Sequence, residues 1–381
     1  MIGEAPPQSA LTPPGEAGGI ATVPSRLTVL QGAALPLLSL LTALIFCAIL
    51  LLATQHNPFT VYDALWTGAV TGQASFANTL VVTTPYILLG LALAIGFKAN
   101  LFNIGAEGQY IVGAIGAVWA GHLAGGLPAV LIGPWVLLAG IVAGALYASI
   151  AGVLKVLSGA HEVITTIMLN YIAAFAVSWL VDDGGALHES GSQIQQSFYL
   201  PKTAWLPIIW PGTPLHAGIL IALVVAVLAY VLIWRTTWGF ELRAVGLNPM
   251  AARSAGISIR NVTIWAMALS GGLSGLAGAI QLAGLQHVLP DPFGSGFGYD
   301  AIAVAIIGGG NPGGIIAAAL LLGALHNGST YMELNAGISG PFVSVIEASI
   351  LFFVAAPVII RWLYFSWGRR KSAEAAGRAT A

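Results

Sequence analysis

Long apolar runs constrain this chain more than any other feature of its sequence. A helix of about 20 apolar residues crosses the hydrocarbon core of a bilayer, and nine apolar runs long enough to do so follow one another here. Only 7% of the 381 residues are charged, whereas soluble domains carry about 25%. We therefore expect an integral membrane protein. The runs cover residues 29–53, 79–97, 103–124, 128–154, 163–181, 215–234, 261–285, 300–325 and 342–363.

Each run is expected to be a helix. Lipid offers the backbone no hydrogen-bond partners, so a spanning segment must be a helix or part of a closed barrel. No segment alternates apolar and polar residues as barrel strands do. The predicted fold class is an all-α polytopic membrane protein, and the single cysteine, Cys47, is expected to pack as a small apolar residue inside the first run.

Basic residues predict the orientation, because loops on the cytoplasmic side retain Lys and Arg. Residues 235–260 contain four arginines and one glutamate, whereas residues 182–214 contain three acidic residues and only Lys202. The first loop is therefore expected to be cytoplasmic and the second extracytoplasmic. Alternating from these loops places all of the 13 Lys and Arg residues except Lys202 in the cytoplasm. The N-terminus and the C-terminus are then both cytoplasmic.

A glycine-rich break completes this topology. Single crossings at 300–325 and 342–363 would leave the basic C-terminal tail outside, so one further reversal is needed. The sequence GGGNPGG at 308–314 divides the eighth run into two short halves. We expect a broken-helix hairpin over 300–328, which brings the total to about ten transmembrane or re-entrant helices. The polar residues 97–100 raise the same possibility at a second place.

The composition along the chain predicts three parts. Residues 1–25 are rich in Pro, Gly, Ala and Ser and are expected to be a disordered cytoplasmic extension. They lack the basic start and short apolar core of a cleaved signal peptide. Residues 26–363 form the transmembrane domain, and residues 364–381 form a basic cytoplasmic tail.

The motifs of nucleotide-binding and metal-binding sites are missing from the sequence. It contains no GxxxxGK[ST] loop, and its His and Cys residues have no metal-ligand spacing. We therefore expect a chain that is not an enzyme, that binds no cofactor or metal, and that takes any ATP chemistry from a partner.

The cytoplasmic loop at 235–260 offers a surface for such a partner. Asn248 is suited to cap a helix and Pro249 to occupy its first turn. The small residues that follow predict a short, low-profile helix able to enter a groove on another protein. An amphipathic connector lying on lipid headgroups is the alternative. The candidate coupling residues are Gly246, Asn248, Pro249, Ala251, Ala252, Ala255 and Gly256.

Polar residues inside the apolar runs are candidates for a transport pathway. An acidic side chain at the centre of a bilayer costs about 2.5–3.5 kcal/mol, so it faces protein or water. Asn103 and Glu107 are four residues apart and share one helical face. Either they cap the helix and complement its dipole, or they line a water-filled path; both can hold. The full set of pathway candidates is Asn103, Glu107, Gln109, Asn170, Gln281 and Asn311.

Two further patterns accompany these residues. Phe102, Tyr110 and Tyr171 are aromatic residues able to stack on a planar substrate, with anchoring at the membrane interface as the alternative. Glycines spaced by four, Gly271 with Gly275 and Gly140 with Gly144, are typical of helices in close contact.

Four segments give a family resemblance. "GLNPMAARSAGIS" resembles the cytoplasmic coupling loop of ABC importer permeases of the branched-chain amino acid, ribose and nucleoside group. "LFNIGAEGQYIVGAIGA" and "HEVITTIMLNYIA" resemble signature segments of the nucleoside and simple-sugar permeases. "DAIAVAIIGGGNPGGIIAAALLLGALHNG" is similar to their broken-helix segment. These segments fall between residues 101 and 328.

The resemblance implies one permease subunit of a bacterial plasma-membrane importer. It implies a second, related permease, a cytoplasmic ABC ATPase with two nucleotide-binding domains that hold ATP and Mg, and an extracytoplasmic substrate-binding lipoprotein. Residues 246–256 would transmit the motion of the ATPase. Independently of the resemblance, the net charge of −1 gives no indication of a nucleic-acid partner. Nucleosides are the expected substrates, with ribose-type sugars and branched-chain amino acids as alternatives.

The residues alone are also compatible with a transporter of another class. Broken helices and buried carboxylates also suit a self-sufficient, ion-coupled secondary carrier. The two classes differ in their need for ATP and for partner subunits.

Overall fold

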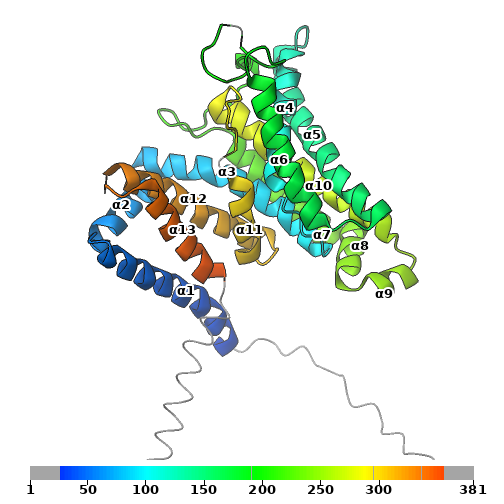
Figure 1. The fold of residues 1–381 in the computed structure, drawn as a ribbon. Coiled ribbons are helices and arrows are strands. Elements are labelled where there is room, and N and C mark those ends of the chain that lie inside the picture. The colour runs from blue at the N-terminus through cyan, green and yellow to red at the C-terminus, as the bar shows by residue number, and fades with distance from the viewer. Residues whose placement is uncertain (1–25, 190, 295, 336, 356–381) are drawn as a thin grey trace, which may run out of the picture.

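The computed structural model describes residues 26–189, 191–294, 296–335 and 337–355. The predicted extension at 1–25 and the predicted tail at 364–381 lie outside the described residues. Figure 1 shows that the described part is built from helices, and its remaining ordered pairing consists of three isolated β-bridges. The all-α class is thus confirmed for these residues.

The helices follow the apolar runs in order. The first half of the chain contains α1 (Arg26–Ala53), α2 (Pro58–Val70), α3 (Gln73–Lys98), α4 (Ala106–His122), α5 (Ala129–Ser158) and α6 (Glu162–Val181). The second half contains η1 (Lys202–Ala204), α7 (Gly218–Arg235), α8 (Thr237–Leu247), α9 (Pro249–Ser254), α10 (Ile259–Gln281), η2 (Leu282–Gln286), α11 (Phe297–Ile307), α12 (Pro312–Asn335) and α13 (Gly340–Ala355).

Helix length and composition make this a multi-pass membrane protein. Within the described residues, six helical segments are long and apolar enough to cross a bilayer. They are α3, α5, α6, α7, α12 and the continuous segment formed by α10 and η2. Two shorter apolar helical segments, Leu41–Ala53 and Phe297–Ile307, accompany them.

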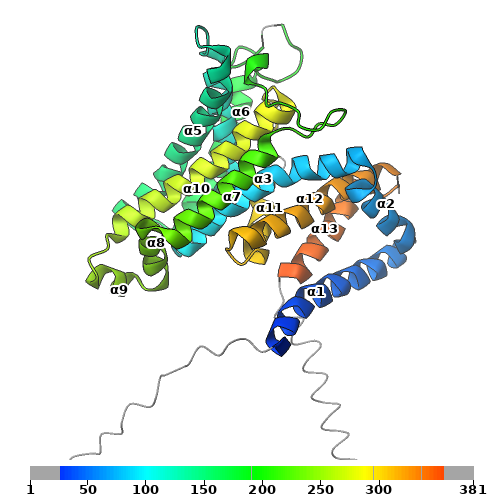
Figure 2. The ribbon, with the colours of Figure 1, turned by 180° about the vertical axis from the view of Figure 1, so that it is seen from behind.

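The helices form two groups joined by α3. In both views α4, α5, α6, α7 and α10 lie together, while α1, α2, α12 and α13 lie on the other side (Figures 1 and 2). The second group has its own apolar core, to which Cys47, Val61, Met332 and Ile346 contribute. Cys47 is fully buried there, as expected for a packing residue.

Glycines bring α4, α5 and α10 into backbone contact. A methyl group added at Gly275 would lie 2.2 Å from the carbonyl oxygen of Gly140, and one added at Gly144 would lie 2.3 Å from that of Gly271. A methyl group at Gly113 would meet the Cα of Gly275 at 2.2 Å. The close packing predicted from the four-residue glycine spacing is therefore confirmed.

A non-helical stretch separates α3 from α4. Residues 99–105 turn back along the end of α3, where the amide of Leu101 donates to the carbonyl of Gly96 at 2.9 Å. Ala99, Leu101 and Asn103 in this stretch are buried. Helix α4 therefore begins at Ala106 and has only 17 residues.

A second interruption separates α11 from α12. Gly309 and Gly310 adopt the left-handed conformation, with φ of 62° and 63°, and end the helix that begins at Phe297. The 11 residues of α11 span about 16 Å, roughly half of a bilayer core. Asn311 accepts a hydrogen bond from the amide of Gly313 at 3.2 Å, in the first turn of α12. Helices α11 and α12 pack on each other and on α3.

Helices α2 and α8 were not predicted from the apolar runs. Asn57 begins α2 by accepting a hydrogen bond from Phe59, and Pro58 occupies the first turn. Its 13 residues are too few to cross a bilayer, which is why a search for spans misses it. Thr236 caps α8 by accepting a hydrogen bond from Gly239 at 3.0 Å.

Candidate functional site

Two amide side chains fix the non-helical stretch before α4. Asn103 donates to Gln109 at 2.9 Å, and Gln109 donates back to Asn103 at 2.8 Å. Asn103 also donates to the hydroxyl of Ser270 at 2.9 Å, and Ser270 donates to the carbonyl of Ala92 at 2.7 Å. The pair thereby links α4 to α10 and α3. Both amides are 1% exposed.

The start of α4 does not have the Asn103 cap that was considered for it. Gly105, not Asn103, is the N-cap residue, and it makes no side-chain cap. Asn103 instead accepts from the amide of Gly105 at 3.1 Å, within the turn that precedes the helix. The Asn103 side chain forms hydrogen bonds with Gln109 and Ser270 and so joins α4 to α10.

Glu107 connects the start of α4 to the start of α11. One carboxylate oxygen accepts from the amide of Gly296 at 3.1 Å, and the other accepts from the amide of Gly298 at 2.5 Å. These donors stand at the N-terminus of α11, where the helix dipole favours an anion. A methyl group at Gly298 would lie 2.3 Å from the Glu107 amide nitrogen, so glycine is required for this approach.

Asn170 ties the middle of α6 to both of these helix starts. It accepts from the amide of Gly108 at 2.8 Å and donates to the carbonyl of Ile104 at 2.9 Å. Its amide also lies 3.1 Å from the hydroxyl of Tyr299, on the first turn of α11. The Asn170 residue is 3% exposed.

Four of the six pathway candidates therefore lie together. Asn103, Glu107, Gln109 and Asn170 surround the N-terminus of α4 and join it to α3, α6, α10 and α11. Gln281 lies in the last turn of α10 and is 7% exposed, while Asn311 is exposed at the α11–α12 break. No hydrogen bond within the described part of the chain joins either of them to the other four.

The aromatic candidates occupy contrasting positions. Tyr110 is 1% exposed and stacks on Phe293 with ring centroids 5.1 Å apart, so a substrate cannot reach its ring in this arrangement. Phe102 and Tyr171 are 50% and 58% exposed. Tyr299, which sequence reasoning missed, is 44% exposed and is held by Asn170. Its sequence context, GFGYD, gives no sign of this contact with α6.

Helices α8 and α9 form a protrusion at one end of the molecule (Figure 1). Asn248 accepts from the amides of Met250 and Ala251 at 3.0 and 3.1 Å, which confirms the predicted Asn cap and short helix. Leu247 and Met250 are 88% and 73% exposed, whereas Ala252 is buried.

The coupling candidates differ in exposure. Gly246 is half-buried, and a methyl group there would lie 2.0 Å from the carbonyl oxygen of Lys98 at the end of α3. The protrusion is therefore seated directly on α3. The exposed members of the candidate set are Asn248, Pro249, Ala251, Ala255 and Gly256.

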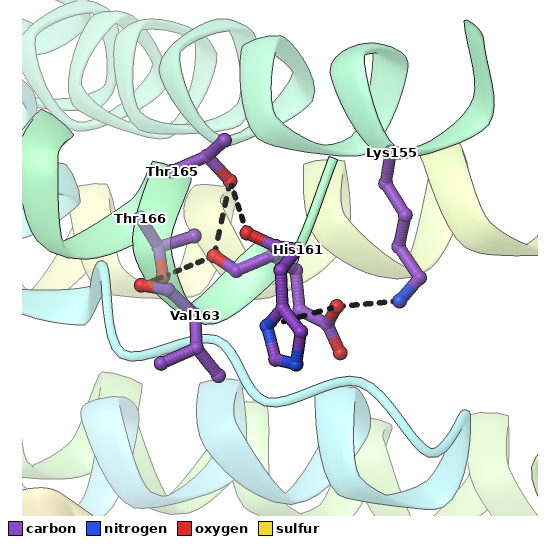
Figure 3. Close-up of polar contacts among 6 residues, drawn as sticks. Lys155, His161, Val163, Thr165 and Thr166 are labelled. Atoms are coloured by element: carbon purple, nitrogen blue, oxygen red, sulfur yellow. Dashed lines mark hydrogen bonds and ion pairs between the residues drawn. The ribbon is translucent and has the colours of Figure 1, made fainter. Parts of the chain in front are cut away.

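An ion pair closes the turn between α5 and α6. Lys155 donates to Glu162 at 2.5 Å, and His161 lies 3.9 Å from the same carboxylate oxygen. Figure 3 shows Lys155 reaching from α5 toward this turn, and Thr165 and Thr166 bonding back to the first turn of α6. Both hydroxyls therefore donate to a backbone carbonyl of their own helix.

At the opposite end of the molecule, backbone hydrogen bonds join the segment before α7 to the segment after α10, as from Leu200 to His287 at 2.8 Å. His216 is 1% exposed, and its Nδ1 accepts from the amide of Gly218 at 3.1 Å. The ring of His287 stacks on Trp205 with centroids 3.7 Å apart. Burial, aided by the charge of His287, lowers the pKa of His216 to about 4. Burial also lowers the pKa of His287.

The described residues contain no group of three or more His, Cys, Asp or Glu arranged to hold a metal ion. The polar cluster around α4 consists of amides, one carboxylate and hydroxyls whose partners are mostly backbone groups. Such an arrangement can hold helix ends together and offer hydrogen bonds.

Comparison with known proteins identifies relatives over most of the chain. A guanosine ABC transporter permease protein, NupP of Bacillus subtilis, is 37% identical over 337 residues, covering 86% of this chain and 94% of the relative. A nucleoside ABC transporter permease protein, NupB of Lactococcus lactis, is 35% identical over 335 residues, covering 85% and 91%. A glucose ABC transporter permease protein of Haloferax volcanii is 33% identical over 327 residues, covering 84% and 86%.

A family model extends this similarity to the described fold. This sequence-family model carries the description "Branched-chain amino acid transport system / permease component". It matches residues 75–360, which include every helix from α4 to α13. The match covers the polar cluster around α4, the protrusion and the α11–α12 break. The chain therefore belongs to the family of branched-chain amino acid transport system permease components.

Proposed function

We propose that this chain is the transmembrane permease subunit of an ATP-driven ABC importer for nucleosides. The observation that carries the proposal is its 37% identity, over 94% of the relative, to a guanosine ABC permease. A nucleoside ABC permease at 35% identity supports the same substrate class. The chain itself is a transport component and not an enzyme.

The proposed topology has about ten membrane helices with both chain ends in the cytoplasm. The distribution of Lys and Arg supports this orientation. The short α11 and its glycine break fit a half-helix that enters the membrane and turns back. The proposed membrane helices are α1, α3, α4, α5, α6, α7, α10, α11, α12 and α13.

A second, related permease is proposed to complete the pathway. Two guanosine ABC permease proteins of Bacillus subtilis, NupP and NupQ, match this chain at 37% and 28% identity. Two nucleoside permease proteins of Lactococcus lactis match at 35% and 29%. Such pairs favour a heterodimer of permeases in a bacterial plasma membrane.

The energy source is proposed to be a cytoplasmic ABC ATPase with two nucleotide-binding domains, which would hold ATP and Mg. The α8–α9 protrusion supports this partnership, because Leu247 and Met250 expose apolar side chains where α8 ends and α9 begins. Apolar side chains at a polar surface are typical of a contact with another protein. An extracytoplasmic lipoprotein is proposed to deliver the substrate.

The polar cluster around α4 is proposed to border the substrate pathway. Asn103, Glu107, Gln109 and Asn170 lie where α4 and α11 both begin, and helix N-termini at membrane depth are typical of transport sites. Gln281 and Asn311 are proposed to lie farther along the same path, toward its two ends.

The test is reconstitution of the complete importer in proteoliposomes. We expect uptake of radiolabelled guanosine that requires ATP, the ATPase and the binding protein. Uptake by this chain alone, driven by a sodium or proton gradient, would instead make it a secondary carrier. Competition by unlabelled glucose, ribose and leucine tests the other substrates, of which a simple sugar has specific support from the glucose permease relative.

A further inference from the structure

Tyr299 combines an exposed aromatic ring with a fixed hydroxyl. The residue lies on the first turn of α11 and is 44% exposed. Its hydroxyl is 3.1 Å from the side-chain amide nitrogen of Asn170, which can only donate. The phenol oxygen therefore accepts this hydrogen bond. Since no other hydrogen bond of this hydroxyl occurs among the described residues, the phenol proton stays free to donate.

The depth of Tyr299 in the membrane argues against a role as an interfacial anchor. Its partner Asn170 is the ninth of the 20 residues of α6, near the middle of that helix. Tyrosines that anchor a protein in a membrane lie at the level of the headgroups. A tyrosine hydroxyl near the bilayer centre needs a polar partner, and a free phenol proton there favours contact with a polar ligand or water over contact with lipid.

The neighbouring groups add to this polar surface. Glu107 accepts from two amides at the start of α11, directly before Tyr299. Asn170 is itself fixed by the amide of Gly108 and the carbonyl of Ile104. The Tyr299 ring is consequently held at a set place by buried groups, although nearly half of the residue is exposed.

We propose that Tyr299 contacts the substrate as it passes through the permease. Its ring stacks on the nucleobase, and its phenol proton donates to a base nitrogen or carbonyl oxygen. Asn170 is the positioning residue that holds the ring and leaves the proton free. This inference rests on the proposed function, and it adds the residue that recognises the base.

The chemistry of the contact favours a base over a sugar. A planar heteroaromatic base offers both a face for stacking and acceptor atoms at its edge. Base–aromatic stacking changes binding by roughly 5- to 150-fold, and a single neutral hydrogen bond by about 5-fold. A sugar without a base would use the hydroxyl alone.

The experiment uses the complete importer in proteoliposomes and measures guanosine taken up per ATP hydrolysed. This ratio is chosen because loss of correctly assembled complex lowers both rates together and leaves the ratio unchanged. We expect Tyr299→Leu, which loses both interactions, to lower the ratio by about 25-fold or more, and Tyr299→Phe, which keeps the ring, to lower it about 5-fold.

Asn170→Asp tests the positioning role. The carboxylate still accepts from Gly108 and accepts the phenol proton that the substrate would otherwise receive, although it can no longer donate to the carbonyl of Ile104. We expect the same fall as for Tyr299→Phe, and no further fall when the two substitutions are combined.

Phe175→Leu is the matched control, since Phe175 is an aromatic residue that is 72% exposed on the same helix as Asn170. We expect its ratio to equal that of the unsubstituted importer. An unchanged ratio in both Tyr299→Leu and Tyr299→Phe would overturn the inference. If the unsubstituted importer carries no guanosine with ATP, the proposed function itself fails, which is a separate result.

Discussion

At the residue scale, Glu107 provides both acceptors for the amides at the start of α11. Glu107→Ala leaves the Gly296 and Gly298 amides without these acceptors, and each unpaired buried donor costs about 1–3 kcal/mol. We expect a lower melting temperature of the detergent-solubilised protein, with Glu107→Gln intermediate because one acceptor oxygen is kept. An unchanged melting temperature for Glu107→Ala would show that the two hydrogen bonds contribute nothing.

His216 predicts a pH dependence of stability. Its pKa in the folded chain is about 4, below the ordinary value of 6.5, because burial disfavours the charged form. Below pH 6.5 the unfolded chain therefore binds a proton that the folded chain does not. The titration of His216 therefore leaves the free energy of unfolding unchanged above pH 6.5 and lowers it by about 3 kcal/mol as the pH falls to 4.

His216→Asn tests this dependence, because an amide oxygen can still accept from Gly218 but does not titrate. We expect the melting temperature of the variant to fall less between pH 6.5 and 4 than that of the unsubstituted protein. His122→Asn, at an exposed position, serves as the control. Identical pH profiles for His216→Asn and the unsubstituted protein would contradict the assignment.

The sequence indicated which polar residues matter but not how they are bonded. Asn103 and Glu107 were expected on one face of a helix, yet Asn103 lies in the turn before α4. Its partners Gln109 and Ser270 are 6 and 167 residues away. Pairings over such separations depend on how the helices pack, which a single sequence does not reveal. Tyr299 was missed for the same reason.

At the element scale, the contact of α5 with α10 depends on glycine. A methyl group at Gly275 would lie 2.2 Å from a backbone oxygen of α5, and that backbone cannot move away without shifting the helix. Overpacking of this kind costs about 1–3 kcal/mol or more. We expect Gly275→Ala to lower both the melting temperature and the yield of monodisperse protein.

Gly133→Ala is the control for this prediction. A methyl group at Gly133, which lies on α5, would have its nearest neighbour 4.0 Å away, which is an ordinary contact. It is expected to leave both measurements unchanged. Alanine has the higher helix propensity, so propensity cannot lower the melting temperature of either variant. Equal falls for the two substitutions would show that the close approach of α10 to α5 is not the cause.

Helices were predicted best where the sequence contains a long apolar run. Each such run contains a helix in the described residues, because membrane depth leaves the backbone no alternative. Helix α2 escaped prediction because it is short and carries Asp63 and several hydroxyl groups. Its position is determined by packing on α12 instead.

At the scale of the whole molecule, the protrusion formed by α8 and α9 is expected to touch the ATPase. Met250 is 73% exposed in the first turn of α9. We expect a photoactivatable reagent attached to Met250→Cys to label the ATPase in the assembled importer. Cys47 is fully buried and should not react with the reagent.

Phe59→Cys is the matched control, because Phe59 is 83% exposed on α2, in the other helix group. It is expected to label lipid. Labelling of lipid alone from Met250→Cys would show that the protrusion lies on the membrane, which was the alternative interpretation of this loop.

The pairing of α1 with α13 has a consequence for how the protein is made. The thiol of Cys47 on α1 donates to the carbonyl of Ile346 on α13 at 3.7 Å, and these residues are 299 positions apart. A ribosome that adds about 5–20 residues per second needs roughly 15–60 s to make the intervening chain. Throughout that interval the side of α1 that will contact α13 cannot form this contact. Helix α1 is therefore made well before the helix that becomes its neighbour in the folded protein.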